Sequence, residues 1–310
     1  LWAGGTLGTS AGTLSLQFGA TGTVNNTVQL NRTFSNTGTT SVSGAFNTSS
    51  TGIINNGTTG TMNLTGTGTQ ASGLGAFNNL GTLKKTAGPV SIIDLPYTNQ
   101  GPSTLQIDDN RSLQFVATRF TQNSGVINLV GTNSLLDVGG SFTNNASGSI
   151  RGKGTFQMSG GTLTNNGNLV PGGAASIGQL TIGGVLNQSA TGKMTMEING
   201  AGSTHDSVYV SGYNATLAGA MDIDTGTYQP TSGVTYGMVS SSGGSVSGAM
   251  TVSGGAFTYT SAPAGSQYDV KWLMRTILAT DAYARQSRTR SALEQSPFVA
   301  NCPQRLRADQ

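Results

Sequence analysis

The stretch that decides the fold reads Phe142-Thr-Asn-Asn-Ala-Ser-Gly and is followed, 21 residues after its first residue, by Leu163-Thr-Asn-Asn-Gly. In each copy an apolar residue is followed by a short run rich in Asn, Thr or Gln and then by a glycine. The pattern recurs along the chain at intervals of 20–23 residues, which indicates a repeat architecture. Its apolar anchors are Phe34, Ile54, Phe77, Tyr97, Phe120, Phe142, Leu163 and Leu186.

Short alternating runs fill each repeat, as in residues 112–116 (Ser-Leu-Gln-Phe-Val) and 126–130 (Val-Ile-Asn-Leu-Val). Alternation with a period of two is typical of half-buried strands, and the Gly and Asn between them tolerate the positive φ of tight corners. We therefore predict an all-β fold, a parallel and right-handed β-helix or β-solenoid with 20–23 residues per rung. Its anchors would stack in one interior column.

The Asn residues that follow the anchors would stack as well. A side-chain amide both donates and accepts hydrogen bonds, so stacked Asn residues predict an amide ladder along the coil, as in cross-β structures. Asn also suits turns, and the two interpretations are compatible. Charged residues make up 9% of the chain. This scarcity fits a stack in which like charges would lie about 5 Å apart.

The composition excludes several classes of protein. The 47 Gly residues disfavour helices, and 35% hydrophobic residues argue against disorder. The net charge of +3 comes from the last 36 residues, so no nucleic-acid partner is expected. A single Cys excludes an intrachain disulfide and a multi-Cys metal site. No apolar run is long enough to span a membrane.

Changes in composition divide the chain into four parts. Residues 1–33 hold strands before the first anchor and predict a cap or a subunit contact; residues 34–200 hold the rungs. Residues 201–272 predict a modified β stem that caps the coil. Residues 273–310 form an Arg-rich tail whose apolar spacing predicts a helix over about 273–295. That helix would either lie over the final rung or dock a neighbouring subunit, and the sequence leaves both open.

Three stretches carry a family resemblance: Gly81-Thr-Leu-Lys-Lys-Thr, Gly160-Gly-Thr-Leu-Thr-Asn-Asn-Gly and Asp206-Ser-Val-Tyr-Val-Ser-Gly. Over about residues 75–272 the chain resembles the rungs of large secreted bacterial β-helix proteins. It is similar to the C-terminal stem of autotransporter passengers and related filamentous-haemagglutinin-like adhesins. The resemblance implies a secreted, extracellular or cell-surface protein. About forty residues stand where an autotransporter has its membrane β-barrel, so we expect a cleaved passenger or a relative exported by another route.

Because β-helices also carry polysaccharide lyases and glycosidases, the carboxylates are candidates for catalysis. Asp222 and Asp224 would share one side of a strand, as a catalytic acid and base could. Asp108-Asp109 is typical of a turn, and His205-Asp206 of a loop before a strand. A solvated turn or strand-edge role is favoured for all of them. We therefore predict no catalytic residue, no cofactor and no metal site.

A structural or binding role remains. We expect an extracellular structural or adhesive protein of a bacterial surface that assembles end to end with itself into a filament, fibre or sheath. Host-surface or matrix glycans are a further expected partner. The alternatives are a carbohydrate-active β-helix enzyme, in place of the expected non-enzyme, and a phage fibre or tailspike segment. The residues expected to contact neighbouring subunits are Trp2, Trp272, Leu273, Ile277, Tyr283 and Cys302, the last with an intersubunit disulfide left open.

Overall fold

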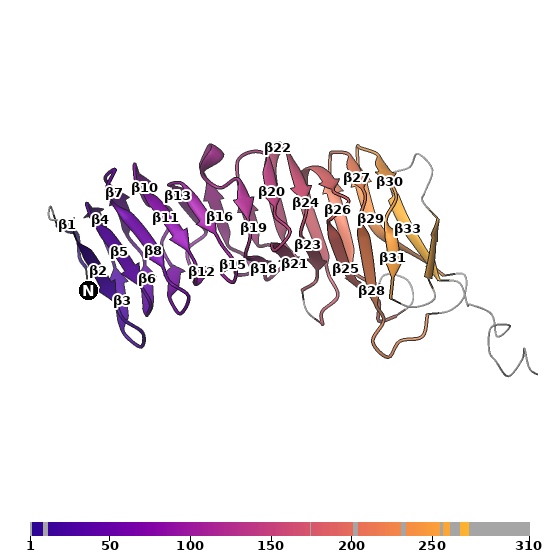
Figure 1. Cartoon of the computed structure of the whole chain (residues 1–310), viewed down its shortest axis with the longest axis horizontal. Helices are drawn as coiled ribbons and strands as arrows, with labels where there is room; N and C mark the ends of the chain where they lie inside the picture. Colours follow the sequence, from indigo (N-terminus) through magenta and orange to yellow (C-terminus); the bar gives the residue numbers. More distant parts are fainter. Residues whose placement is uncertain are drawn as a thin grey trace, which may run out of the picture. The chain divides into compact units, whose positions relative to one another are not determined.

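The structure, a computed structural model, describes residues 2–8, 12–173, 175–200, 204–230, 234–254, 257–260 and 267–272. Over these residues the chain is an all-β parallel β-solenoid with about 22 residues per turn (Figure 1), which confirms the predicted fold class. The helical segment within the described part is the short 3₁₀ turn η1 (Ala117–Arg119). The helix predicted at 273–295 lies outside the described residues.

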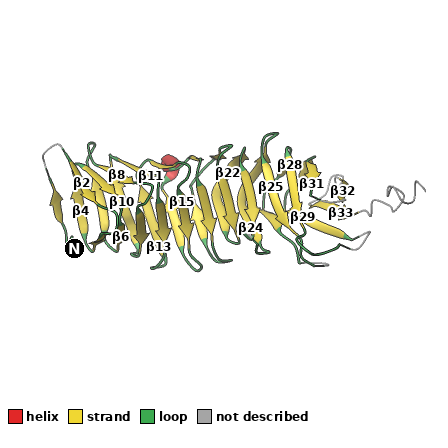
Figure 2. Ribbon diagram, turned by 60° about the horizontal axis from the view of Figure 1, so that its bottom comes forward, coloured by secondary structure: helices red, strands yellow, loops and turns green. Residues whose placement is uncertain are grey.

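Each rung lays its strands along three faces of the coil, and strands of one face pair in parallel from rung to rung (Figure 2). Face 1 contains β1 (Gly5–Leu7), β4 (Thr27–Leu30), β7 (Ala45–Thr48), β10 (Gly68–Gly73), β13 (Val90–Asp94), β16 (Ser112–Phe115), β19 (Leu135–Asp137), the first halves of β22 (Thr155–Asn165) and β24 (Gln179–Gln188), β26 (Ser207–Ser211) and β29 (Thr235–Ser242).

Face 2 contains β2 (Thr13–Leu16), β5 (Thr33–Asn36), β8 (Ile53–Asn56), β11 (Ala76–Asn79), β14 (Tyr97–Asn99), β17 (Gln122–Asn123), β20 (Phe142–Asn144), the second halves of β22 and β24, β27 (Ala215–Leu217) and β30 (Val246–Gly248). Face 3 contains β3 (Thr21–Val24), β6 (Thr39–Val42), β9 (Thr61–Leu64), β12 (Thr82–Lys85), β15 (Thr104–Ile107), β18 (Val126–Leu129), β21 (Ser149–Gly152), β23 (Asn168–Pro171), β25 (Lys193–Glu197), β28 (Ala220–Asp224) and β31 (Thr251–Ser253).

The anchor residues lie on the inner side of face 2, each at most 4% exposed. Phe120 lies in the column between Tyr97 and Phe142, because its ring centroid is 4.8 Å from the ring centroid of each. Burial of every second residue on these strands directs the anchors inward and their neighbours outward. The anchor pairs in register are Phe34–Ile54, Ile54–Phe77, Phe77–Tyr97, Phe142–Leu163 and Leu163–Leu186.

The parallel stack extends beyond both ends of the anchor series. Leu14 pairs with Phe34 at one end, and Leu186 pairs with Ala215 at the other. Strands before residue 34 and after residue 200 therefore belong to the same coil, and the boundaries predicted at those positions lie inside one continuous stack.

Two antiparallel pairings follow the last rungs. The strand β33 (Gln267–Trp272) pairs antiparallel with β29 and with β32 (Phe257–Thr260). A strand laid along β29 occupies backbone groups with which a further parallel rung would otherwise pair. The end of face 1 is therefore closed by β33.

A ladder of side-chain amides runs inside the coil beside the anchor column, as predicted. Each member except the last, Gln188, donates a hydrogen bond from its amide nitrogen to the amide oxygen of the next rung, over 2.6–2.9 Å. All members are at most 2% exposed, so these bonds satisfy amide groups that water does not reach. The members are Asn36, Asn56, Asn79, Asn99, Asn123, Asn144, Asn165 and Gln188.

In several repeats a glycine lets the chain pass over this ladder. At Gly148 an added Cβ would collide with Asn144 Oδ1 and with the Asn123 carbonyl. Gly60 lies in the same way against the Asn56 amide and the Asn36 carbonyl. The Asn and the Gly of the repeat therefore depend on each other: the Asn amide fills the corner, and the glycine, which has no side chain, leaves room for it.

Candidate functional site

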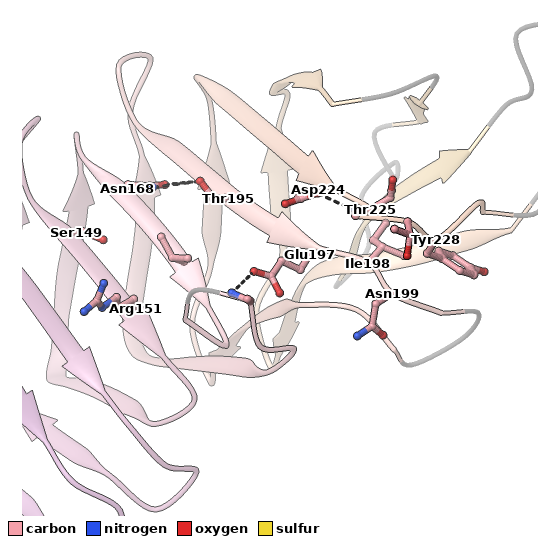
Figure 3. A pocket seen from close by; sticks show the side chains of 14 residues that line it. Ser149, Arg151, Asn168, Thr195, Glu197, Ile198, Asn199, Asp224, Thr225 and Tyr228 are labelled. Carbon is pink, nitrogen blue, oxygen red and sulfur yellow. Dashed lines mark hydrogen bonds between the residues drawn. The ribbon is translucent and has the colours of Figure 1, made fainter.

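An open groove of about 900 Å³ crosses the outer side of face 3 (Figure 3). Its floor consists of outward-facing side chains from β21, β23, β25 and β28, four adjacent strands of this face. Ala175 and Tyr228 line it from the chain segments that follow β23 and β28. The groove thus follows the coil over several rungs and is open to an extended ligand.

The groove forms because one corner of the coil lengthens toward the C-terminus. The segments that join face 3 to face 1 in four successive rungs are residues 153–154, 172–178, 198–206 and 225–234. The corner beside the amide ladder stays short, as in residues 145–148 and 218–219. Insertions that gather on one face of a repeat protein often build its binding surface.

Two carboxylates lie on neighbouring rungs in this groove. Glu197 and Asp224 pair in register between β25 and β28, and adjacent strands are about 4.8 Å apart. Glu197 Oε1 accepts a hydrogen bond from the Ala175 N–H at 2.7 Å, and Asp224 Oδ1 accepts one from the Gly226 N–H at 2.8 Å. A backbone donor from a corner segment therefore orients each acid (Figure 3).

Uncharged and cationic groups complete the lining. Asn168 Nδ2 donates to Thr195 Oγ1 over 3.1 Å, and Arg151 stands on the same face two strands from Glu197. Tyr228 adds an aromatic ring. Amide, hydroxyl, guanidinium and carboxylate groups beside an aromatic ring offer both hydrogen bonds and stacking contacts to a ligand rich in hydroxyl groups.

A buried carboxylate behind the groove joins two of its segments. Asp206 is fully buried and accepts hydrogen bonds from Gly178 N–H at 2.8 Å and Glu197 N–H at 2.9 Å. Burial raises the pKa of Asp206 to about 7, against the lowering effect of these two donors. Its carboxylate holds the segment that follows β23 against the end of β25, and so fixes the backbone that positions Glu197.

The structure separates the carboxylates that the sequence analysis considered. Asp222 and Asp224 do face the same side of β28. Asp222, however, forms an ion pair with Lys193 and accepts a hydrogen bond from Ser253, and the Lys193 ammonium holds its pKa below the usual range. It is therefore engaged on the surface away from the groove lining, whereas Asp224 is part of that lining.

The other two candidate pairs, Asp108-Asp109 and His205-Asp206, form hydrogen bonds and ring contacts within turns and corners of the coil. Asp108 accepts a hydrogen bond from Gln106 Nε2 at 2.7 Å, and Asp109 accepts one from Asn133 N–H at 3.1 Å at an exposed turn. The His205 ring lies edge-on to Tyr236 at 5.5 Å, with Nε2 3.1 Å from the Gly237 carbonyl. These contacts are those of turn and corner residues.

Sequence reasoning did not bring Glu197, Arg151 and Asp206 together. Glu197 and Asp224 are 27 residues apart, outside the 20–23-residue period by which the rungs were aligned. The usable signal was the Met-Thr-Met-Glu run at 194–197 beside Met-Asp-Ile-Asp at 221–224, two strands of like alternation that end in an acid. Aligning these two strands requires the register between their rungs, and the longer corner segments between them hide that register in the sequence.

Among the residues expected at subunit contacts, two lie in the described part. Trp2 forms a parallel bridge with Val24, and its ring packs edge-on against Phe34 at 5.3 Å, so it is half-buried within its own chain. The backbone of Trp272 ends β33 and pairs with Phe257. Leu273, Ile277, Tyr283 and Cys302 lie outside the described residues.

Neither the family models nor the curated proteins compared with the chain give a significant match. In the described part of the chain, no group of three or more His, Cys, Asp or Glu side chains is arranged to hold a metal ion. The same part contains no helix with the length and apolar character needed to cross a membrane.

Proposed function

We propose that the chain is a structural or adhesive β-solenoid of a bacterial surface, exported from the cell and related to autotransporter passengers and filamentous-haemagglutinin-like adhesins. The observation that supports this best is the internal continuity of the coil, in which anchors and amides repeat from rung to rung. Such a stack gains stability from each nearest-neighbour contact and grows in one dimension. Rigid extension is what a surface rod needs.

Self-assembly would use the first rung. Within the described residues, β1 and β2 each pair with one strand only, β4 and β5, whereas β3 pairs with β6 and is bridged on its other side by Trp2. Leu7, Leu14 and Leu16 are partly buried against the core there, and Phe18 is 78% exposed beside them. Unpaired strand edges beside apolar side chains are templates for another chain. Because β33 closes face 1 at the other end, the last rung of a second copy would extend the stack here through β30 and β31, which pair on one side in the described residues.

The test is negative-stain electron microscopy of the full chain, with Leu14→Arg as the variant. Leu14 lies in the first rung, and the arginine side chain places a charge in the proposed contact. Filaments in the wild type that become single rods in the variant support the proposal, while Ser41→Arg, on the outer side of β6, serves as the control. A wild type that remains a single rod at all concentrations would contradict it.

The groove favours a second candidate, a carbohydrate-active protein. The specific observation is the pair Glu197 and Asp224 on adjacent rungs, each oriented by a backbone donor, because glycoside hydrolysis uses two carboxylates. Glu197→Gln and Asp224→Asn would abolish release of reducing ends from neutral and acidic polysaccharides. Binding without hydrolysis by the wild type would leave the groove as an adhesive site for glycans.

A further inference from the structure

Face 2 differs from the other two faces in its outer surface. No Lys, Arg, Asp or Glu occurs in any described strand of this face, from β2 to β30. The other faces do carry charge in their rung strands, with Asp94 and Asp137 on face 1 and Lys84, Arg151 and Lys193 on face 3. The uncharged surface is therefore a property of one face and does not follow from the low charge of the chain alone.

The outward residues in the middle of face 2 form a polar column in register. Each is a hydroxyl or amide residue, and each is partly or fully exposed. Parts of the column are already bonded along the coil: Asn78 Nδ2 donates to Asn55 Oδ1 at 2.9 Å, and Thr98 Oγ1 donates to Asn78 Oδ1 at 3.1 Å. The column consists of Ser15, Ser35, Asn55, Asn78, Thr98, Gln122, Thr143, Thr164, Asn187, Thr216 and Ser247.

This surface selects a partner by charge and by period. A polyanion or polycation would gain no charge complementarity from it. Hydroxyl and amide groups repeated at the strand spacing of about 4.8 Å match a partner that repeats at the same spacing along its length. A second copy of this chain has that spacing by construction, because its own face 2 is built from the same rungs.

We infer that face 2 is a lateral contact surface on which a second copy of this chain packs through its own face 2. Small Ser, Thr and Asn side chains allow two such faces to approach and interdigitate, as identical polar ladders do between paired sheets. The contact is isologous, so it closes as a pair of rods. It is independent of the end-to-end assembly proposed above, since it uses the side of the coil and leaves both ends free.

The experiment is sedimentation velocity of the full chain over a range of protein concentrations, with two matched double variants. Thr143→Lys with Thr164→Lys places two lysines in register on the outer side of face 2. Ser41→Lys with Asn63→Lys places two in register on the outer side of face 3. All four positions are half-buried and point outward, so both variants add the same charge at positions of similar exposure.

The expected result is a concentration-dependent dimer in the wild type and in the face 3 variant. The face 2 variant should weaken dimerisation by about tenfold or more, because each copy would bring two lysines into an uncharged contact. Equal dimerisation of both variants would overturn the proposal. A monomeric wild type would also overturn it. If that monomer bound an insoluble neutral polysaccharide and the face 2 variant did not, face 2 would be assigned to a glycan. Electron microscopy separates the two assemblies, since the lateral contact changes the width of particles and the end contact changes their length.

Discussion

Removing one amide from the middle of the internal ladder should destabilise the coil far more than removing one from its outer surface. Asn123 is the chosen position because its side chain is fully buried and bonded on both sides. It accepts from Asn99 Nδ2 at 2.8 Å and donates to Asn144 Oδ1 at 2.9 Å and to the Gly125 carbonyl at 2.8 Å. The Gly125 N–H also donates to it, at 3.2 Å.

The expected cost follows from the groups that Asn123→Ala leaves behind. Asn99 Nδ2 keeps a second acceptor, the Val126 carbonyl at 3.3 Å. Asn144 Oδ1 and the Gly125 N–H lose their partner in the core, and a buried polar group without a partner costs about 1–3 kcal/mol. Two such groups give a loss of about 4 kcal/mol in the free energy of unfolding.

The control is Asn78→Ala on the outer side of face 2. Asn78 has the same kind of bonds, to Asn55 and from Thr98, but water can replace them, so the expected cost is about 1 kcal/mol or less. Urea unfolding followed by circular dichroism gives the midpoint of each variant. A shift for Asn123→Ala no larger than that for Asn78→Ala would refute the view that the buried ladder contributes to stability. Asn123→Leu separates the lost bonds from the cavity, since it restores volume and not the hydrogen bonds.

Three further predictions concern a corner and two titrating groups. Gly148→Ala should lower the urea midpoint strongly because its Cβ would collide with the Asn144 amide, whereas Gly140→Ala, with nothing within 4 Å of an added Cβ, should leave it nearly unchanged. Burial lowers the pKa of Lys85 to about 8 from 10.5; between these values the unfolded chain binds more protons, so stability should rise with pH from about 8 to about 10.5, by up to about 3 kcal/mol, and Lys85→Met should remove this rise. Burial raises the pKa of Asp206 to about 7 from 3.8; here the folded chain binds more protons, so this group's contribution should be complete below about pH 4 and be lost as pH rises through 7, and Asp206→Asn should remove that dependence.

The anchors and the ladder could be predicted from sequence because both depend on residues close together in one repeat. Phe142-Thr-Asn supplies an inward anchor, an outward hydroxyl and an inward amide in three consecutive positions, and strand alternation alone orients them. The glycine that follows completes the corner. A period of 20–23 residues then aligns one rung with the next.

The first rung escaped this reasoning because it lacks the amide. Leu14 pairs with the anchor Phe34, but Leu16 stands opposite Asn36, at the position that the ladder rungs fill with Asn or Gln. At the far end, Thr216 pairs with Asn187, and the inward residue after it is Leu217. The coil continues through both places by parallel strand pairing and apolar packing without the amide, which a search for the Asn motif does not detect.

The buried Lys85 is a second feature beyond the reach of the pattern. Its position alternates inward like that of an apolar residue, and it is 0% exposed. The ammonium is satisfied by the carbonyls of Gly66 and Ala87, the former at 2.6 Å. Those carbonyls belong to corners whose conformation the sequence does not specify, so the acceptors that make a buried lysine tolerable are visible only in the fold.

The end of the ladder also explains where the candidate sites lie. Each amide before Gln188 donates to the amide of the next rung, so Gln188 is the last acceptor of the ladder. Its own Nε2 is buried and has no hydrogen-bond partner in the described residues. The corner beside the ladder stays short where a glycine passes over an amide, and the longest insertions lie in the corner between face 3 and face 1. Those insertions supply the backbone donors that orient Glu197 and Asp224. Face 2, beside the ladder, is therefore regular, and its strands carry no charge, while the corner between face 3 and face 1 varies; this arrangement supports self-contact on one side of the coil and ligand contact on the other.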